Sequence, residues 1–500
     1  MADKLIVPRI PRGFKDSFVE EVIARKQMID TICEVYHLFG FEPLETPAVE
    51  YVETLGKFLP ESTTPEGGIF SFRDSDQQWT ALRYDLTAPL SRVFAQYQES
   101  LPLPYRRYQY GPVFRNEKTD VGRFRQFYQC DFDTVGTSSM AADAEVCLVL
   151  LAAFQQLGLP KNVISLKVNH RKVLDGVLER AGVFAISGSE TSEDIEKRRL
   201  TVLRAMDKFD RLGLDGVAAL LGEGRVDISG DPTQGAGLSD AQARIVLDFL
   251  SIPTTTHSET IEAMTQAVGS SAVGIEGIAD LKQIARLLEE AKVGPEVTFD
   301  PSVIRGLAYY TGPVFEAVLT FQVPDEEVGS KAFGSVAGGG RYDDLVMRFT
   351  GKRVPATGAS IGVDRLLAAL KHYGTSAANS YQGPVVVTVF DNKLLGFYQG
   401  VVTDLRNAGI PAELYLGTET LGKQFKYAEQ RRSPLALIAG PDEIGRNEIS
   451  VKNLSLGKEL GKSEAFKEDR EKWIRERPGQ MTVARTDLIK TVQSYLRPPQ

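Results

Sequence analysis

The sequence predicts a multidomain protein in which α-helices and β-strands are mixed. Its 500 residues exceed the ~100–200 residues of a typical domain. Amphipathic runs with a helical period alternate along the chain with short segments rich in aromatic and β-branched residues. Hydrophobic and charged residues make up 42% and 25% of the chain, as in ordinary globular proteins, which excludes a disordered, collagen-like or disulfide-framework chain.

Several features predict a cytoplasmic protein without a membrane segment. No apolar run approaches the ~18–20 residues that span a bilayer, and the N-terminus lacks an apolar core long enough for a signal peptide. The cysteines Cys33, Cys130 and Cys147 form no CxxC pair, and their odd number fits a reducing compartment. The histidines lack metal-ligand spacing, so a structural zinc site is not expected. The net charge of -8 disfavours a general nucleic-acid coat but allows a local basic surface.

The N-terminal part is predicted to contain a long helix and a β-hairpin. Residues 18–40 have apolar side chains at helical spacing, and Gly40 marks the expected end of the helix. Residues 41–51 contain two prolines and are expected to be extended. Residues 107–116 and 122–136 are rich in aromatic and β-branched residues, which predicts two antiparallel strands joined by the polar tip EKTDV.

The remaining chain is predicted to contain a helical insertion and a separate C-terminal domain. From residue 171 to residue 300 the chain is mostly helical, and strand-like patterns return at 305–321. The small and polar residues of 372–384 suit a linker. Beyond it, short apolar segments alternate with helical ones, which is the βαβ rhythm of a small α/β domain.

Arginines in three separated blocks indicate a phosphate-binding site. Arg115, Arg123 and Arg125 flank the predicted hairpin, Arg305 opens RGLAYYTG, and Arg365 follows GASIGVD. Guanidinium groups are permanently charged and match phosphate oxygens. One such arginine taken alone is more often solvated or ion-paired surface. Beside glycine, aromatic and acidic residues, the three blocks are better explained by convergence on one phosphate-bearing ligand.

Two glycine clusters accompany these arginines, at residues 334–340 and 358–362. Such clusters permit positive φ or a close backbone approach, and tight turns are their commoner explanation. Neither fits GxxxxGK[ST] or a GxGxxG after a parallel strand, which disfavours a P-loop ATPase or a dinucleotide dehydrogenase.

A further set of residues suits a small zwitterionic ligand. Carboxylates with amide and phenol groups can bind an ammonium group and a second basic group. The tyrosines of RGLAYYTGPVFEA are equally well explained as packing residues of a strand. The set comprises Asp85, Thr87, Gln129, Asp133, Tyr309 and Tyr310.

These segments resemble the motifs of the class II aminoacyl-tRNA synthetases. FEPLETPAVEY resembles motif 1, with Pro47 as its proline, and YGPVFRNEKTDVGRFRQFYQCDFD resembles motif 2. TGASIGVDRLLAAL resembles motif 3, with Arg365 as its arginine. RGLAYYTGPVFEA and GGGRYDDL are similar to the two histidine-specific motifs of the histidyl-tRNA synthetases, and LGKQFKYAEQRRSPLALIAG is similar to their anticodon-binding module. The resemblance covers nearly the whole chain.

The resemblance implies an α+β fold: an antiparallel class II synthetase sheet with helices, a helical insertion domain and a C-terminal α/β anticodon-binding domain. Residues 1–170 and 301–372 would form the two parts of the catalytic domain, residues 171–300 the insertion, and residues 384–500 the anticodon-binding domain. Motif 1 forms a dimer interface in this class, so a homodimer is implied by the resemblance alone.

The implied activity is that of a histidine–tRNA ligase. L-Histidine and ATP form histidyl-adenylate with release of pyrophosphate, and the histidyl group then passes to the terminal 3′-hydroxyl of tRNA(His) with release of AMP. Magnesium should accompany the ATP phosphates, mostly through water and substrate oxygens. Arg115, Arg305 and Gln129 are the implied catalytic residues, and no general base is assigned to the enzyme.

For ATP, the resemblance implies that Arg115 binds the α-phosphate and Glu117 the adenine amino group. Phe127 would stack on adenine, and Arg123 and Arg365 would hold the β- and γ-phosphates.

For histidine, the resemblance implies an ammonium end and an imidazole end. Asp85, Thr87 and Gln129 would bind the α-amino group. Asp133 and Tyr310 would read the two imidazole nitrogens, and Arg305 would lie near the carboxylate, opposite Arg115. The implied histidine-binding residues are Asp85, Thr87, Arg115, Gln129, Asp133, Arg305, Tyr309 and Tyr310.

The chain departs from the common family pattern at several positions. Asp85 and Asp133 replace glutamates, Ala308 replaces an aspartate, and the hairpin tip EKTDV lacks the usual arginine-proline-glutamine run. Because the tip should contact the tRNA acceptor end, we hypothesise a divergent bacterial subtype with altered acceptor-end recognition.

This hypothesis predicts weak dependence on the extra 5′ guanosine of tRNA(His). Aminoacylation kinetics on transcripts with and without that nucleotide would measure the dependence. The usual strong preference for the guanosine would contradict the hypothesis.

Three other functions are alternatives to a histidine–tRNA ligase. A catalytically silent paralogue, such as the regulatory subunit of histidine biosynthesis, commonly lacks motif arginines and the anticodon-binding domain, which this chain keeps. A class II ligase for threonine, proline or glycine shares the C-terminal module but not the histidine motifs. A pure RNA-binding module fits poorly with a net charge of -8.

Overall fold

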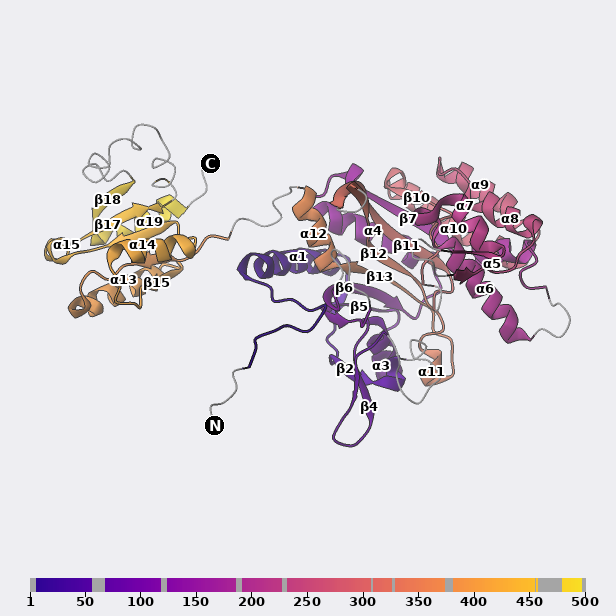
Figure 1. Ribbon diagram of the computed structural model, residues 1–500, viewed down its shortest axis with the longest axis horizontal. Coiled ribbons are helices and arrows are strands. Elements are labelled where there is room, and N and C mark those ends of the chain that lie inside the picture. The colour runs from indigo at the N-terminus through magenta and orange to yellow at the C-terminus, as the bar shows by residue number, and fades with distance from the viewer. Residues whose placement is uncertain are drawn as a thin grey trace. The chain divides into compact units, whose positions relative to one another are not determined.

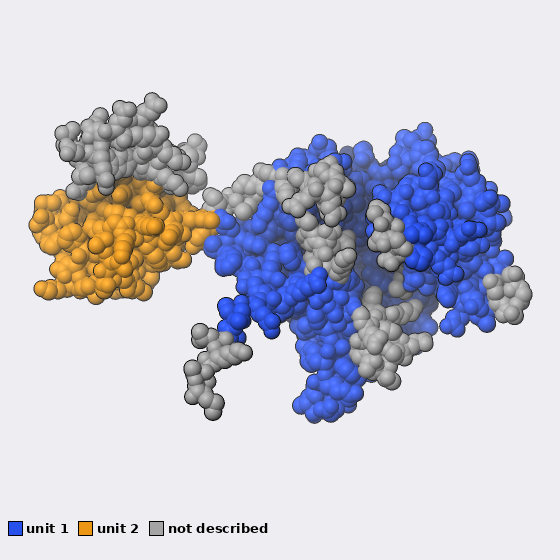
Figure 2. All heavy atoms as spheres, viewed as in Figure 1, with its two compact units in different colours: residues 1–378 blue, residues 379–500 orange. Residues whose placement is uncertain are grey.

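The computed structural model consists of two compact units, residues 1–378 and residues 379–500 (Figures 1 and 2). None of its described helices has both the length and the hydropathy needed to cross a membrane. The structure describes residues 6–55, 68–117, 124–185, 191–226, 232–306, 309–325, 329–373, 381–454, 456 and 479–496.

The first unit is built on an eight-stranded sheet of order β1-β5-β6-β13-β12-β11-β7-β10. From β5 to β7 all neighbouring strands are antiparallel, as predicted, whereas β1 and β10 pair in parallel at the two edges. The strands are β1 (Glu42–Pro43), β5 (Tyr105–Phe114), β6 (Gln126–Val135), β7 (Ile164–His170), β10 (Val297–Phe299), β11 (Pro313–Asp325), β12 (Gly329–Arg341) and β13 (Ala356–Gly362).

Helices α1 (Val19–Leu38), α4 (Met140–Gln156) and α12 (Val363–Tyr373) pack against this sheet. The first of them ends where the sequence predicts, because Gly40 has a φ of +78° and its amide donates to the carbonyl of His37 at 2.9 Å.

Shorter elements complete this part of the first unit. They are α2 (Val52–Leu55), α3 (Thr87–Tyr97), α11 (Met347–Thr350) and the three-stranded sheet β2-β4-β3, with β2 (Val49–Tyr51), β3 (Ser71–Arg73) and β4 (Trp79–Leu82).

The predicted helical region lies between β7 and β10, which are parallel neighbours at one edge of the sheet. It is therefore the crossover connection of a β-helix-β arrangement, and it also contains a two-stranded hairpin that the sequence did not indicate. Its elements are α5 (Arg171–Arg180), α6 (Ser192–Met206), α7 (Phe209–Leu221), β8 (Gly224–Val226), β9 (Pro232–Gln234), α8 (Asp240–Leu250), α9 (His257–Val268) and α10 (Ala272–Glu290).

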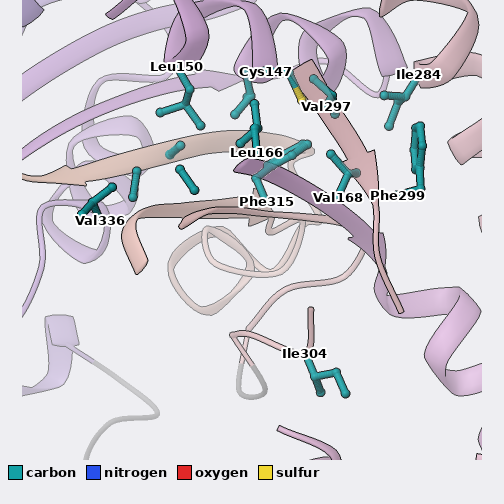
Figure 3. Close-up of a cluster of buried hydrophobic side chains, with 14 of the residues drawn as sticks. Cys147, Leu150, Leu166, Val168, Ile284, Val297, Phe299, Ile304, Phe315 and Val336 are labelled. Atoms are coloured by element: carbon teal, nitrogen blue, oxygen red, sulfur yellow. The ribbon is translucent and has the colours of Figure 1, made fainter. Parts of the chain in front are cut away.

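The hydrophobic core runs without a break from the sheet into these helices. Figure 3 shows Cys147 and Leu150 of α4, Val168 of β7 and Phe315 of β11 in the same cluster of buried side chains as Ile284 of α10. All of these side chains are fully buried. The crossover helices are thus stabilised by the same core that supports the sheet.

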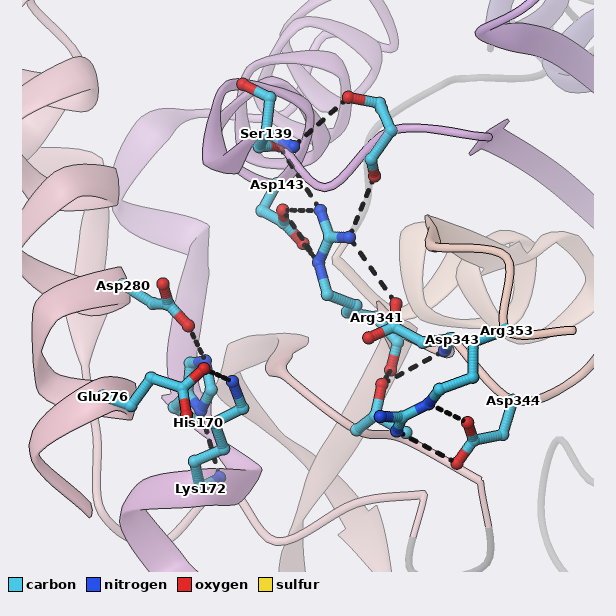
Figure 4. A network of polar contacts seen from close by, with 12 residues as sticks. Ser139, Asp143, His170, Lys172, Glu276, Asp280, Arg341, Asp343, Asp344 and Arg353 are labelled. Carbon is cyan, nitrogen blue, oxygen red and sulfur yellow. Dashed lines mark hydrogen bonds and ion pairs between the residues drawn. The ribbon is translucent and has the colours of Figure 1, made fainter. Parts of the chain in front are cut away.

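The junction between β7 and α5 is held by polar side chains. Asn169 Nδ2 donates to the carbonyls of Pro301 and Val303, both at 3.0 Å. The buried His170 accepts the amide proton of Lys172 at 3.1 Å, and its other ring nitrogen lies 3.1 Å from Asp280 on α10 (Figure 4). These contacts fix the first turn of α5 to the strand.

The second unit contains a five-stranded mixed sheet of order β15-β14-β16-β17-β18. Its first three strands are parallel, in line with the predicted βαβ rhythm, and the last two pairings are antiparallel. The elements are β14 (Val385–Val387), α13 (Leu395–Asn407), β15 (Ala412–Leu414), α14 (Leu421–Gln430), β16 (Leu435–Ile438), α15 (Pro441–Gly445), β17 (Glu448–Asn453), β18 (Gln480–Ala484) and α19 (Leu488–Leu496).

Candidate active site

A cavity of about 360 Å³ lies over the middle strands of the large sheet. Its lining comes mainly from β6, β12 and β13, from the residues that follow β5, from the start of α3 and of α12, and from the chain between β10 and β11. Every described residue to which the resemblance assigns a contact with ATP or histidine lines this cavity. These residues are Asp85, Thr87, Arg115, Glu117, Phe127, Gln129, Asp133, Arg305, Tyr309, Tyr310 and Arg365. Arg125, expected among the converging arginines, does not line it, and its Nε donates to the carbonyl of Glu117 at 3.2 Å. Arg123, Ala308 and most of the hairpin tip lie outside the described residues.

Strand β6 supplies one row of the lining. Because side chains alternate between the two faces of a strand, Phe127, Gln129, Asp131 and Asp133 point to the cavity. The intervening Cys130 is fully buried in the core. Asp131 was missed by the sequence reasoning, although the same two-residue spacing could have indicated it.

Arg115 follows the end of β5 and is held between two aromatic rings. Its guanidinium carbon lies 4.3 Å from the ring centre of Tyr84 and 5.3 Å from that of Phe127. Its Nε donates to the carbonyl of Tyr84 at 3.2 Å. The Tyr84 hydroxyl donates to Glu117 at 2.6 Å, so one tyrosine, which the sequence did not indicate, orients both an arginine and a carboxylate.

Asp133 is paired inside the protein. Its Oδ2 lies 2.6 Å from Nη2 of Arg107, the fully buried residue opposite it on β5, and its Oδ1 accepts a hydrogen bond from the Tyr342 hydroxyl. Burial raises the pKa of Asp133 although Arg107 opposes this shift. Gly358 is required beside it, since a Cβ there would lie 2.2 Å from the carboxylate. Neither Arg107 nor Tyr342 was expected at the site.

The two tyrosines of RGLAYYTG pack against each other at the cavity wall, with their ring planes tilted by 54°. Their ring centres are 4.5 Å apart and their hydroxyls 3.4 Å apart. Burial raises the pKa of Tyr309 to about 12, so its phenol stays neutral at physiological pH. Gly306, with a φ of +62°, and Gly340 lie against the ring of Tyr310, where a Cβ would approach to 1.9 and 2.8 Å. The glycines therefore fix the position of this ring.

Asp85 lies directly before α3 and is held by the start of that helix. Its Oδ1 accepts the amide protons of Thr87 and Ala88, at 3.1 and 2.8 Å.

Arg305 and Arg365 bring two further guanidinium groups to the cavity. Nη2 of Arg305 lies 2.5 Å from Glu316 on β11, and about two fifths of the arginine side chain remains exposed. Nη2 of Arg365, on α12, donates to the carbonyl of Phe333 at 2.7 Å. Three elements far apart in the sequence thus direct cationic groups to one cavity, which suits an anionic ligand.

Comparisons with known proteins identify the family. The family model described as "Histidyl-tRNA synthetase" matches residues 13–366, and that described as "Anticodon binding domain" matches residues 384–494. A histidine–tRNA ligase of Cereibacter sphaeroides is 54% identical, with 97% of each chain covered, and one of Dinoroseobacter shibae is 53% identical, with 97% of this chain and 96% of the relative covered.

Among solved structures, the histidyl-tRNA synthetase of Nostoc sp. PCC 7120 has a TM-score of 0.71 at 27% identity, covering 98% of this chain and 100% of the other. The family model alone spans well over half of the chain, and the cavity holds the residues on which the resemblance rests. The chain belongs to the histidyl-tRNA synthetase family of class II aminoacyl-tRNA synthetases and carries its anticodon-binding domain.

Proposed function

We propose that this protein ligates L-histidine to tRNA(His) in two steps, through histidyl-adenylate formed with ATP. One observation carries the proposal: a single cavity combines three guanidinium groups with a buried polar pocket large enough for an amino acid. Family membership and relatives that are histidine–tRNA ligases at 54% and 53% identity support the same function.

At the ATP end, Arg115 binds the α-phosphate and Arg365 the β- and γ-phosphates, together with Arg123. Attack of the histidine carboxylate on the α-phosphorus accumulates negative charge on the non-bridging oxygens, which fixed cations stabilise. Phe127 stacks on the adenine ring and Glu117 accepts a hydrogen bond from its amino group. The hydrogen bond from Tyr84 keeps this carboxylate in position.

At the histidine end, Asp85, Thr87 and Gln129 bind the ammonium group and Arg305 lies near the carboxylate. Asp133 and Tyr310 contact the imidazole nitrogens, with Tyr309 beside them. A carboxylate has about four acceptor positions, so Asp133 can accept an imidazole N–H while it keeps its existing partners.

Magnesium is proposed to enter with ATP, held by phosphate oxygens and water. When bound, the ion neutralises phosphate charge; positioning of the α-phosphate remains the task of Arg115.

The domain roles follow the same proposal. Residues 1–170 and 301–372 carry out adenylate formation, residues 171–300 form the insertion, and residues 384–500 bind the anticodon. The three cysteines are free thiols, which supports the proposed cytoplasmic location.

A homodimer is proposed on the surface formed by the motif 1 strands. Val49 and Tyr51 of strand β2, at the end of the motif 1 segment, expose 40% and 51% of their surface, although large apolar side chains favour burial. Sedimentation velocity of the purified protein at micromolar concentration is expected to give a mass near 110 kDa, twice the 55.0 kDa of one chain. A concentration-independent monomer would contradict the proposal.

The proposed activation step predicts ATP–pyrophosphate exchange that depends on histidine alone, before any tRNA is added. Threonine, proline and glycine serve as controls, since class II ligases for these amino acids share the C-terminal module. An apolar substitute cannot satisfy the buried polar groups of the pocket, so discrimination of about 10⁴–10⁵ is expected. Binding of histidine without exchange would instead favour the silent regulatory paralogue.

A further inference from the structure

Among the described residues, three buried acceptor atoms on β6 have no hydrogen-bond partner. One of them, Oδ2 of Asp133, is ion-paired with Arg107, which leaves two atoms with neither a hydrogen bond nor an ion pair. They are Oε1 of Gln129 and Oδ1 of Asp131, whose residues are 8% and 2% exposed. Both residues line the cavity. Buried polar atoms are almost always satisfied, so an unsatisfied pair beside a cavity indicates a ligand group that donates hydrogen bonds.

A serine on the neighbouring strand orients these two acceptors. Ser360 lies opposite Asp131 in the β13–β6 register. The Gln129 amide nitrogen donates to the Ser360 hydroxyl at 2.6 Å, and the Asp131 carboxylate is hydrogen-bonded to the same serine. With the amide nitrogen and one carboxylate oxygen thus engaged, the amide oxygen and the other carboxylate oxygen remain for a ligand.

The charges around Asp131 favour the binding of a cation. Burial raises the pKa of Asp131 to about 7; Arg107 opposes this shift, and the carboxylates of Asp133 and Asp85 add to it. Arg107 is already paired with Asp133. A bound cation with several N–H donors would stabilise the ionised carboxylate and satisfy both free acceptors at once.

We propose that Asp131 binds the α-ammonium group of the substrate histidine together with Gln129, and makes a free amino group a requirement for recognition. An ammonium group has three donors in a tetrahedral arrangement, which matches acceptors from more than one element. Asp85 and Thr87 supply further acceptors from the start of α3, so the three N–H donors are shared among these side chains. This inference rests on the proposed function and adds a specificity-determining residue to it.

The test compares three ligands on the wild-type protein and on Asp131→Asn, by calorimetric measurement of Kd. L-Histidine has both the ammonium and the carboxylate, histamine lacks the carboxylate, and imidazole-4-propionate lacks the ammonium. The substitution is expected to raise the Kd of histidine and of histamine by about 10–100-fold, which corresponds to the loss of one charged hydrogen bond. The Kd of imidazole-4-propionate should rise by less than about twofold, since this ligand has no ammonium group to contact Asp131.

Asp300→Asn is the matched control. Asp300 is also a buried aspartate, but it is paired with Lys167 and does not line the cavity, so all three affinities should stay unchanged. In ATP–pyrophosphate exchange, Asp131→Asn should raise the KM for histidine with little change in kcat, because the ammonium contact is the same in the ground and transition states.

Equal weakening of all three ligands would overturn the inference, because it would mean that Asp131 acts only on the structure of the site or on the imidazole. Unchanged binding of histidine would also overturn it. Asp131→Ser, smaller and neutral, repeats the comparison if the asparagine variant does not fold. A wild-type protein that neither binds nor activates histidine would contradict the proposed function instead, so the two failures are distinguishable.

Discussion

Replacement of Arg115 by leucine is expected to lower the kcat of histidine-dependent ATP–pyrophosphate exchange by about 10²–10³-fold, the usual cost of removing one fixed donor to a charged transition state. The guanidinium group is held in advance by the rings of Tyr84 and Phe127 and by the carbonyl of Tyr84. It therefore needs no reorganisation when charge builds up on the phosphate oxygens. Steady-state exchange kinetics at saturating ATP and histidine measure the effect.

The control for this experiment is Arg106→Leu. Arg106 lies on the same strand, β5, and also covers an aromatic ring, with its guanidinium carbon 4.3 Å from the ring centre of Phe41. It pairs with Glu145 and does not line the cavity, so its loss should leave kcat within about twofold. If Arg115→Leu raised only the KM for ATP, the arginine would bind ground state and transition state equally and the assigned role would be wrong.

Replacement of Arg341 by leucine is expected to lower the free energy of unfolding of the first unit by about 3–5 kcal/mol. Arg341 forms a buried ion pair with Asp143 of α4, and the two residues are 4% and 0% exposed (Figure 4). The arginine also donates to the carbonyls of Thr137 and Ser139 at 3.0 and 3.3 Å. The substitution leaves the carboxylate of Asp143 buried without its cation. Urea titration followed by circular dichroism measures the loss.

The double variant Arg341→Leu/Asp143→Leu separates the ion pair from simple packing. Since both charges are removed, its stability should return close to that of the wild type. A double variant as unstable as Arg341→Leu would mean that the hydrogen bonds to the two carbonyls, rather than the unpaired carboxylate, account for the loss.

The sequence alone was sufficient to predict those parts of the site that depend on patterns within a short segment. The alternation along β6 and the aromatic and glycine residues around Arg305 and Tyr310 are visible in short segments, and so are the strands and helices that carry them. Gly40 ends α1 because of its own positive φ, a property that can be predicted from the residue and its immediate neighbours.

The partners of these residues could not be predicted in the same way. Arg107 meets Asp133 only because of the β5–β6 register, and Tyr84 reaches Glu117 from a separate segment. A lone arginine in a strand gives no local indication that it will be fully buried. Ser360 likewise joins Gln129 to Asp131 through the pairing of strands more than two hundred residues apart, which is a property of the assembled sheet.

The position of the helical region between two parallel edge strands limits how far this enzyme can be shortened. Parallel neighbours cannot be joined by a tight turn, because the chain must return to the opposite end of the sheet before it pairs again. A variant without the helices would still need about a dozen residues to span that distance. It would also uncover the apolar surfaces of α4 and β7 that now face them. Engineering or evolution can therefore exchange this region for another covering connection, but cannot simply remove it.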